Sequence, residues 1–322
     1  MKKLPKLAIV IPCFNEEAVL CETEVRLLQV LDRLTAGQMI DSDSHLVFVD
    51  DGSRDNTWNL IEDASRRESR VQGLKLSRNR GHQNAVLAGL MTSKGDILIS
   101  ADADLQDDLE AIDQMVSAYQ DGSDIVYGVR KARATDTWFK RVTAESYYRL
   151  LAKFGVEIVF NHADYRLMSR RAVEALREYR EVNIFLRGII PQLGYRSAVV
   201  YYDRNERFAG ESKYPLSKML ALAWQGITSF STTPLRMITG LGFIISVGSI
   251  AFSAWALGVR LFSDQAIPGW ASTVVPIYLI GGIQLLSLGV IGEYLGKIYT
   301  ETKGRPRYFV EINTRVRSEG DN

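Results

Sequence analysis

Two long stretches of the chain contain no charged side chain, residues 237–259 and residues 265–292. A helix needs roughly 20 apolar residues to cross the ~30 Å hydrocarbon layer of a membrane, and both stretches exceed that length. Buried helices of globular proteins seldom run as far without a charge. We therefore expect two transmembrane helices, at about 237–259 and 270–292, with the start of the second stretch, around Trp270, forming a loop and an interfacial anchor.

The charges that flank these stretches predict their orientation. The connecting turn holds Arg260 against Asp264, whereas Lys and Arg residues precede the first stretch and follow the second. These basic residues are Lys213, Lys218, Arg236, Lys297, Lys303, Arg305, Arg307, Arg315 and Arg317. By the positive-inside rule both ends lie in the cytoplasm, which makes this a multi-pass protein of the cytoplasmic membrane. Glycines in both stretches permit a homo-oligomer, although packing within one hairpin explains them equally well.

The rest of the composition excludes several classes of protein. A formal net charge of +1 over 322 residues argues against a nucleic-acid-binding protein that relies on bulk positive charge. Two cysteines do not make a disulfide scaffold, which agrees with a reducing cytosolic environment. Neither a dinucleotide-binding nor a P-loop glycine motif is present, and three scattered histidines make no zinc site.

Residues 1–213 alternate apolar runs with helical periodicity. Strands are predicted at 7–11, 45–49, 71–76, 96–100 and 124–129. This alternation predicts an α/β fold with a mainly parallel sheet covered on both faces. In such sheets ligands bind beyond the carboxyl ends of the strands, which is where the polar clusters of this sequence fall.

The strongest of these clusters is Asp102-Ala103-Asp104, directly after an apolar run. Two carboxylates one residue apart can converge on a hard cation such as Mg²⁺ or Mn²⁺, and Gln106 could add a carbonyl oxygen. Asp-x-Asp triplets are also common in solvated turns. The position after a predicted buried strand favours the metal site. Asp50 and Asp51 are open to two interpretations, as a turn and helix cap or as ligands of a base or ribose.

Six ordered motifs resemble those of family 2 glycosyltransferases with the GT-A (Rossmann-like) fold, in the branch that acts on polyprenyl phosphates. They are IPCFNEE at 11–17, DDGS at 50–53, SRNRG at 77–81, DADLQD at 102–107, DYRLMS at 164–169 and RFAGESKY at 207–214. Dolichol-phosphate mannose synthases belong to that branch. The two apolar stretches, with GEYLG at 292–296 and RPRY at 305–308, most resemble its bactoprenol (undecaprenyl-phosphate) glucosyltransferases.

The resemblance implies a role for each matching residue. The donor nucleotide would be held by Pro12, Asn15, Glu16, Asp51, Arg78 and Asp102. The metal on the donor diphosphate would be held by Asp102, Asp104 and Gln106. Asp164 would be the catalytic carboxylate, and the acceptor phosphate would meet Arg166, Arg207, Ser212 and Lys213. Three positions depart from the family pattern, namely Asp108-Leu109 after the metal motif, Arg80, and His162-Ala163 before Asp164.

The expected function is an inverting transfer of a hexose, with UDP-glucose as first candidate, onto undecaprenyl or another polyprenyl phosphate for O-antigen or other envelope glycans. Other sugars are an aminoarabinose derivative, galactose, or mannose from GDP-mannose. A processive polysaccharide synthase lacks support because no Q-x-x-R-W motif occurs, and a non-catalytic membrane scaffold would not need the three carboxylates.

We divide the chain into four parts. The cytosolic catalytic domain is expected at 1–213, a juxtamembrane amphipathic helix at 214–234, the two transmembrane helices within 235–296, and a cytosolic tail at 297–322. Residues 138–154 could also form an amphipathic helix, either on the membrane surface or as a face of the catalytic core.

Overall fold

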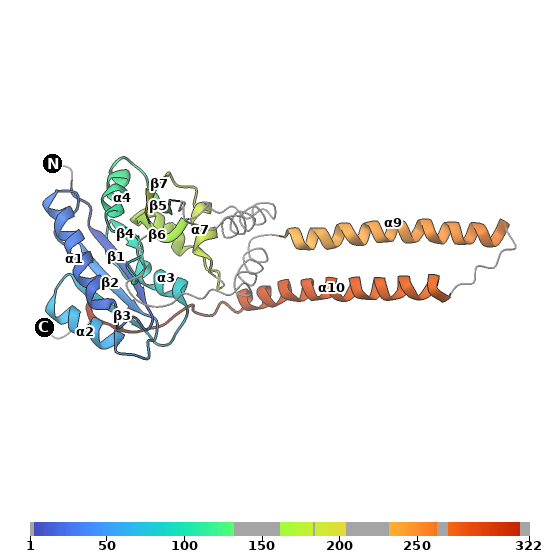
Figure 1. Cartoon of the computed structure of the whole chain (residues 1–322), viewed down its shortest axis with the longest axis horizontal. Helices are drawn as coiled ribbons and strands as arrows, with labels where there is room; N and C mark the ends of the chain where they lie inside the picture. The colour runs from blue at the N-terminus through green and yellow to red at the C-terminus, as the bar shows by residue number, and fades with distance from the viewer. Residues whose placement is uncertain (1–2, 132–161, 183, 204–231, 263–269, 316–322) are drawn as a thin grey trace. The chain divides into compact units, whose positions relative to one another are not determined.

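The computed structural model describes residues 3–131, 162–182, 184–203, 232–262 and 270–315 (Figure 1). Two compact units divide the chain. The sheet unit takes in Met1–Tyr148, Glu157–Tyr214 and Gly304–Asn322, and the helical unit takes in Arg149–Val156 and Pro215–Lys303. The predicted amphipathic segments, 138–154 and most of 214–234, lie outside the described residues.

The sheet unit is a layered α/β structure built around one eight-stranded sheet. Its strands are β1 (Leu7–Cys13), β2 (His45–Asp50), β3 (Val71–Leu76), β4 (Ile97–Ser100), β5 (Ile125–Arg130), β6 (His162–Ser169), β7 (Ser197–Tyr202) and β8 (Val310–Asn313). Its helices are α1 (Leu20–Ala36), α2 (Thr57–Arg67), α3 (His82–Thr92), α4 (Ala111–Gln120), α6 (Arg170–Arg177) and α7 (Leu186–Gln192).

The strands lie in the order β7-β5-β6-β4-β1-β2-β3-β8. The central β4, β1, β2 and β3 are parallel, as are β5 and β7, whereas β6 runs antiparallel to both of its neighbours and β8 runs antiparallel to β3. The sheet is therefore mixed rather than uniformly parallel. The expected α/β class is confirmed, and the five predicted strands are present with ends shifted by at most two residues.

The centre of the sheet is buried on both faces. Every residue of β1, β2 and β4 is buried, which agrees with the apolar runs at 7–11, 46–49 and 97–99 within these strands. Gly89 lets α3 approach β1 closely, because a Cβ built there would lie 2.2 Å from Cγ1 of Val10 and 2.9 Å from Cγ2 of Val49. Close packing of this kind fixes the strand ends that carry the polar loops.

The edge strand β8 comes from the far end of the sequence. The N–H of Ser77 donates to the carbonyl oxygen of Phe309 at 3.0 Å, and the N–H of Gly73 donates to Oγ1 of Thr314 at 3.0 Å. The guanidinium of Arg307 also donates to the carbonyl oxygen of Tyr179. Residues of the predicted C-terminal tail thus complete the sheet next to β3, which the sequence did not predict.

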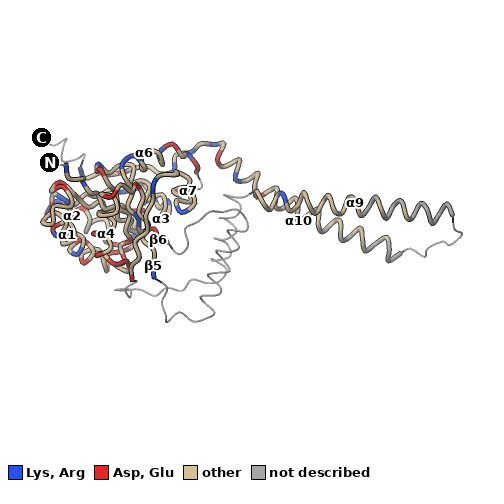
Figure 2. The backbone as a smooth tube through the Cα atoms, turned by 90° about the horizontal axis from the view of Figure 1, so that it is seen from above, with Lys and Arg blue, Asp and Glu red and all other residues tan. Residues whose placement is uncertain are grey.

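The helical unit contains two long helices, α9 (Thr233–Phe262) and α10 (Trp270–Thr302), which contact each other. Large apolar side chains are exposed on both, including Phe243 and Leu285, and charged residues are concentrated in the sheet unit instead (Figure 2). Among the described residues, no helix is long and apolar enough to cross a membrane. The two transmembrane helices therefore stay a prediction.

Candidate functional site

The loops that follow β1 and β2 are bonded to each other. The N–H of Asn15 donates to Oγ of Ser53 at 3.0 Å, and Oδ1 of Asn15 accepts from the N–H of Arg54 at 2.8 Å. The N–H of Glu16 donates to Oγ1 of Thr57 at 2.9 Å. Asn15 and Glu16 are predicted nucleotide-binding residues. They hold the two loops together at the carboxyl ends of β1 and β2.

Asp51 holds the loop that follows β3. Its Oδ1 accepts from the N–H of Arg80 at 2.6 Å, and its Oδ2 accepts from the N–H of Gly81 at 2.8 Å. Gly52 has a φ of +72°, and a Cβ there would lie 2.7 Å from the backbone nitrogen of Asn79. Only glycine suits this left-handed, crowded position, so the second and third loops can touch. Arg78 lies exposed in this loop, and Pro12 is buried in β1.

Asp102 and Asp104 lie in the loop after β4. The N–H of Gln106 donates to Oδ1 of Asp104 at 3.3 Å, and Leu105 between them has a φ of +55°. Burial and the charges of neighbouring carboxylates, Asp107 first among them, outweigh the opposing effect of His82 and raise the pKa of Asp102 to about 6. The loop therefore concentrates negative charge at the end of the central sheet.

This donor set fits a hard divalent cation. Among the described residues, no three acidic, histidine or cysteine side chains form a complete metal cluster. Mg²⁺, however, is commonly bound by one or two carboxylates together with substrate phosphates. Asp102 and Asp104 can provide those two carboxylates, and a cation there would offset the burial and the carboxylate repulsion that raise the pKa of Asp102.

Asp164 lies on β6, beside two arginines and a histidine. Arg166 donates to Oδ1 of Asp164, and Arg187 on α7 reaches both carboxylate oxygens, at 3.2 Å from Nε and 3.2 Å from Nη2. Nε2 of His82 lies 3.5 Å from Oδ2 of Asp164. Burial acts to raise the pKa of Asp164, but the hydrogen bond with His82 and the charges of Arg166 and Arg187 outweigh it and hold that pKa well below its usual range.

His82 connects the two groups of carboxylates. Its Nε2 lies 3.7 Å from Oδ1 of Asp102 as well as 3.5 Å from Asp164. Burial lowers the pKa of His82, but the hydrogen bond with Asp164 and the charge of Asp102 outweigh that effect and raise it. Asp102, His82 and Asp164 thus form a continuous row of polar side chains from the predicted metal site to the predicted catalytic carboxylate.

The structure brings together some of the predicted site residues and adds two. Asp102, Asp104 and Asp164 lie in one charged cluster, while Arg207, Ser212 and Lys213 lie outside the described residues. Arg166 is only 1% exposed, which leaves its predicted contact with an acceptor phosphate without support. His82 and Arg187 were not predicted as site residues. The position of His82 directly after the 77–81 motif was the one available signal for it.

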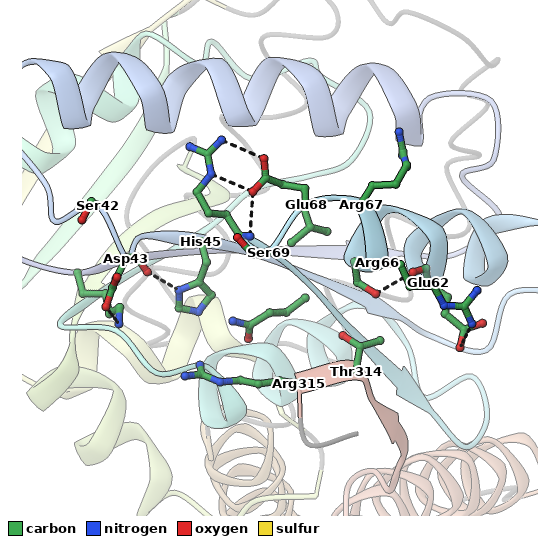
Figure 3. A pocket seen from close by; sticks show the side chains of 15 residues that line it. Ser42, Asp43, His45, Glu62, Arg66, Arg67, Glu68, Ser69, Thr314 and Arg315 are labelled. Atoms are coloured by element: carbon green, nitrogen blue, oxygen red, sulfur yellow. Dashed lines mark hydrogen bonds and ion pairs between the residues drawn. The ribbon is translucent and has the colours of Figure 1, made fainter. Parts of the chain in front are cut away.

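A cavity lies at the opposite end of the strands from these loops, at the amino ends of β2 and β3 (Figure 3). It has a volume of about 1210 Å³ and is lined by charged side chains of both signs. Several of its cations are already paired, such as Arg70 with Glu68 at 3.2 Å and Lys6 with Asp43 at 2.9 Å. This balance of charge and the distance from the loops described above set it apart from the candidate site.

Known proteins match this chain over much of its length. The model of the family "Glycosyl transferase family 2" matches residues 8–177. "Uncharacterized glycosyltransferase YkoT" of Bacillus subtilis (strain 168) is 50% identical over 96% of this chain and 92% of its own length. "Bactoprenol glucosyl transferase" of Shigella phage SfX is 38% identical over 95% of this chain and 99% of its own length.

Solved structures show a more distant likeness. The mannosyltransferase PcManGT from Pyrobaculum calidifontis, in complex with GDP-Man and Mn²⁺, is 16% identical, covers 91% of this chain and 88% of its own, and superimposes with a TM-score of 0.46.

Proposed function

The chain belongs to glycosyltransferase family 2, and from this membership we propose that it transfers a hexose, glucose from UDP-glucose, to the phosphate of a polyprenyl lipid such as undecaprenyl phosphate. That the chain is a glycosyltransferase follows from the family. The lipid acceptor and the glucose are supported by relatives named bactoprenol glucosyl transferase, which align along nearly the whole chain. The observation that carries the proposal is the row Asp102–His82–Asp164, which connects the residue that we assign to the donor with the residue that we assign to the acceptor.

The donor half of the site is built from Asp102 and Asp104. These carboxylates would hold Mg²⁺ or Mn²⁺ on the donor diphosphate, with Gln106 in the same loop. A bound divalent cation would neutralise the negative charge that develops on the leaving diphosphate. The bonded loops of Asn15, Glu16 and Asp51 lie at the same edge of the sheet, where they can hold the nucleotide.

The acceptor half is built around Asp164. A phosphate monoester has a second pKa of about 6, so at neutral pH it is already mostly a dianion and needs no strong general base. Asp164 would then orient the acceptor, and the cations around it would lower the repulsion between acceptor and donor. Direct attack by the phosphate oxygen on the sugar carbon would invert the anomeric configuration.

The membrane placement rests on the sequence. The charge-free stretches 237–259 and 270–292 fall within α9 and α10, and basic residues gather on one side of the hairpin. We infer that these helices cross the cytoplasmic membrane, with the catalytic domain and both termini in the cytoplasm. The domain division given above, with a juxtamembrane helix at 214–234, belongs to the same proposal, and a homo-oligomer would be compatible with it.

Transfer by the purified full chain tests the proposal. The protein in detergent is given undecaprenyl phosphate and, in turn, UDP-glucose, UDP-galactose, UDP-linked aminoarabinose derivatives and GDP-mannose, with and without EDTA. We expect a glucosyl lipid of inverted configuration that is lost in EDTA. A different preferred sugar would change the substrate, undiminished transfer in EDTA would refute the metal, and no transfer from any donor would refute the function.

A matched pair of variants links the result to the site. Asp102→Asn should lose at least about 100-fold in transfer, as expected when a group that supports the developing charge is removed. Asp113→Asn is the control, because Asp113 is a partly exposed aspartate on α4 that pairs with Arg33 at 2.8 Å, away from the cluster. Equal activity of the two variants would contradict the assigned donor site.

A further inference from the structure

Arg166, Arg187 and His82 surround Asp164, and they differ in what they can reach. Arg166 is buried, and its Nε and Nη1 find no partner among the described residues. His82 is shared with Asp102, which belongs to the donor half. Arg187 is 37% exposed and permanently charged, so it can meet a substrate anion and remain beside Asp164.

Contacts at the start of α7 also hold Arg187 in place. It is the second residue of α7, and the N–H of Leu186 at the start of that helix donates to Oε1 of Gln83 at 2.8 Å. Gln83 follows His82 on α3, so the same short segment positions both His82 and Arg187. Leu186 itself is buried, which anchors the helix in the core. A guanidinium fixed in this way loses little conformational entropy when it binds a ligand.

The chemistry of the reaction requires a cation at this position. The acceptor phosphate must approach a donor diphosphate, and the described site already contains Asp102, Asp104 and Asp164 as anions. Asp164 alone would repel the acceptor that it has to orient. A guanidinium beside it removes that repulsion and can bind phosphate through two parallel hydrogen bonds.

We propose that Arg187 contacts the acceptor phosphate directly and bridges it to Asp164. Arg187 contacts Asp164 through Nε and Nη2, and 37% of its side chain is exposed, so a ligand can reach the guanidinium. Arg187 would thus take the role that the sequence assigned to Arg166. This inference rests on the proposed transfer to a lipid phosphate.

Kinetics of the full chain with undecaprenyl phosphate and UDP-glucose test this role, together with direct binding of UDP. Arg187→Gln should raise the KM for undecaprenyl phosphate about 10- to 100-fold, while the Kd of UDP stays within about twofold. Arg187→Lys keeps the charge but not the paired hydrogen bonds, so its KM should lie between. Arg177→Gln is the control, because Arg177 is 50% exposed and pairs with Glu174 on α6.

Each other outcome would overturn the inference. A fall in kcat with unchanged KM would mean that Arg187 only positions Asp164. A weakened Kd of UDP would assign Arg187 to the donor instead. If the melting temperature shows that Arg187→Gln does not fold, Arg187→Lys replaces it in the test. An unchanged KM of Arg187→Lys for undecaprenyl phosphate would then overturn the inference. Absence of transfer by the unsubstituted chain would refute the proposed function, and the role of Arg187 with it.

Discussion

Replacing Asp164 with asparagine should affect stability and activity through different partners. Arg187 and His82 are partly exposed, so both can be solvated when the carboxylate is gone. Arg166 cannot, because only 1% of its side chain is exposed and Asp164 is its charged partner. Removing one member of a buried ion pair costs about 3–5 kcal/mol, since the other charge stays buried without compensation.

The melting temperature is the first readout. In a unit of roughly 200 residues each kcal/mol shifts it by about 2–4 °C, so Asp164→Asn should lower it by about 6–20 °C. Arg166→Met alone should cost less, because Asp164 keeps Arg187 and His82. The double variant Asp164→Asn/Arg166→Met should recover at least half of the loss, since no buried charge remains.

Transfer activity is the second readout, and it should not recover. Both Asp164→Asn and the double variant should transfer sugar at least about 100-fold more slowly, because neither orients the acceptor. A double variant that melts no higher than Asp164→Asn would refute the reasoning about the buried pair. A double variant with restored transfer would refute the role of Asp164 in the reaction.

Three further predictions concern other parts of the sheet unit. Burial lowers the pKa of His45 to about 4 from an unfolded value near 6.5, so the unfolded chain binds a proton at this histidine first as the pH falls. The free energy of unfolding should therefore fall by up to about 3 kcal/mol between pH 7 and pH 4. Urea titrations should show a smaller fall in His45→Asn. Gly89→Ala should destabilise the unit by about 1–3 kcal/mol through the clash with Val10, as measured by urea unfolding, and an unchanged midpoint would contradict the packing of α3. Deleting residues 309–322 should weaken UDP binding severalfold by calorimetry, because Ser77 loses the carbonyl oxygen of Phe309, which holds the loop of the proposed donor residue Arg78; an unchanged Kd would separate β8 from the site.

The central strands could be predicted because burial on both faces of the sheet requires apolar residues along most of their length. Strands buried on both faces are continuous apolar runs, and β1 begins at Leu7, where the sequence indicates. By contrast, β6 contains Asp164 and Arg166 within its length, a pattern that sequence reasoning does not assign to a strand in the middle of a sheet. The two charges are tolerated there because they pair with each other.

The residues of the site also divide into those that local sequence predicts and those that it does not. Asp102, Asp104 and Asp164 belong to local motifs that can be read from a few adjacent residues. The contacts of Asp164 with His82 and Arg187 join residues that are far apart in sequence, and they exist because β6 inserts between β4 and β5. No local pattern contains that strand order, so neither side chain could be assigned from the sequence.

The position of β8 near the end of the sequence also affects the order in which the parts of the chain fold. β3 leaves the ribosome long before residues 310–313, so its outer edge lacks its hydrogen-bonding neighbour while α9 and α10 are being made. The entropy lost in closing so long a connection grows only with the logarithm of its length, so the late docking of β8 adds little to the free-energy cost of folding. On the proposed placement, insertion of the hairpin would precede completion of the sheet. A chain would then complete the loop that follows β3 only once it is at the membrane proposed to hold its acceptor.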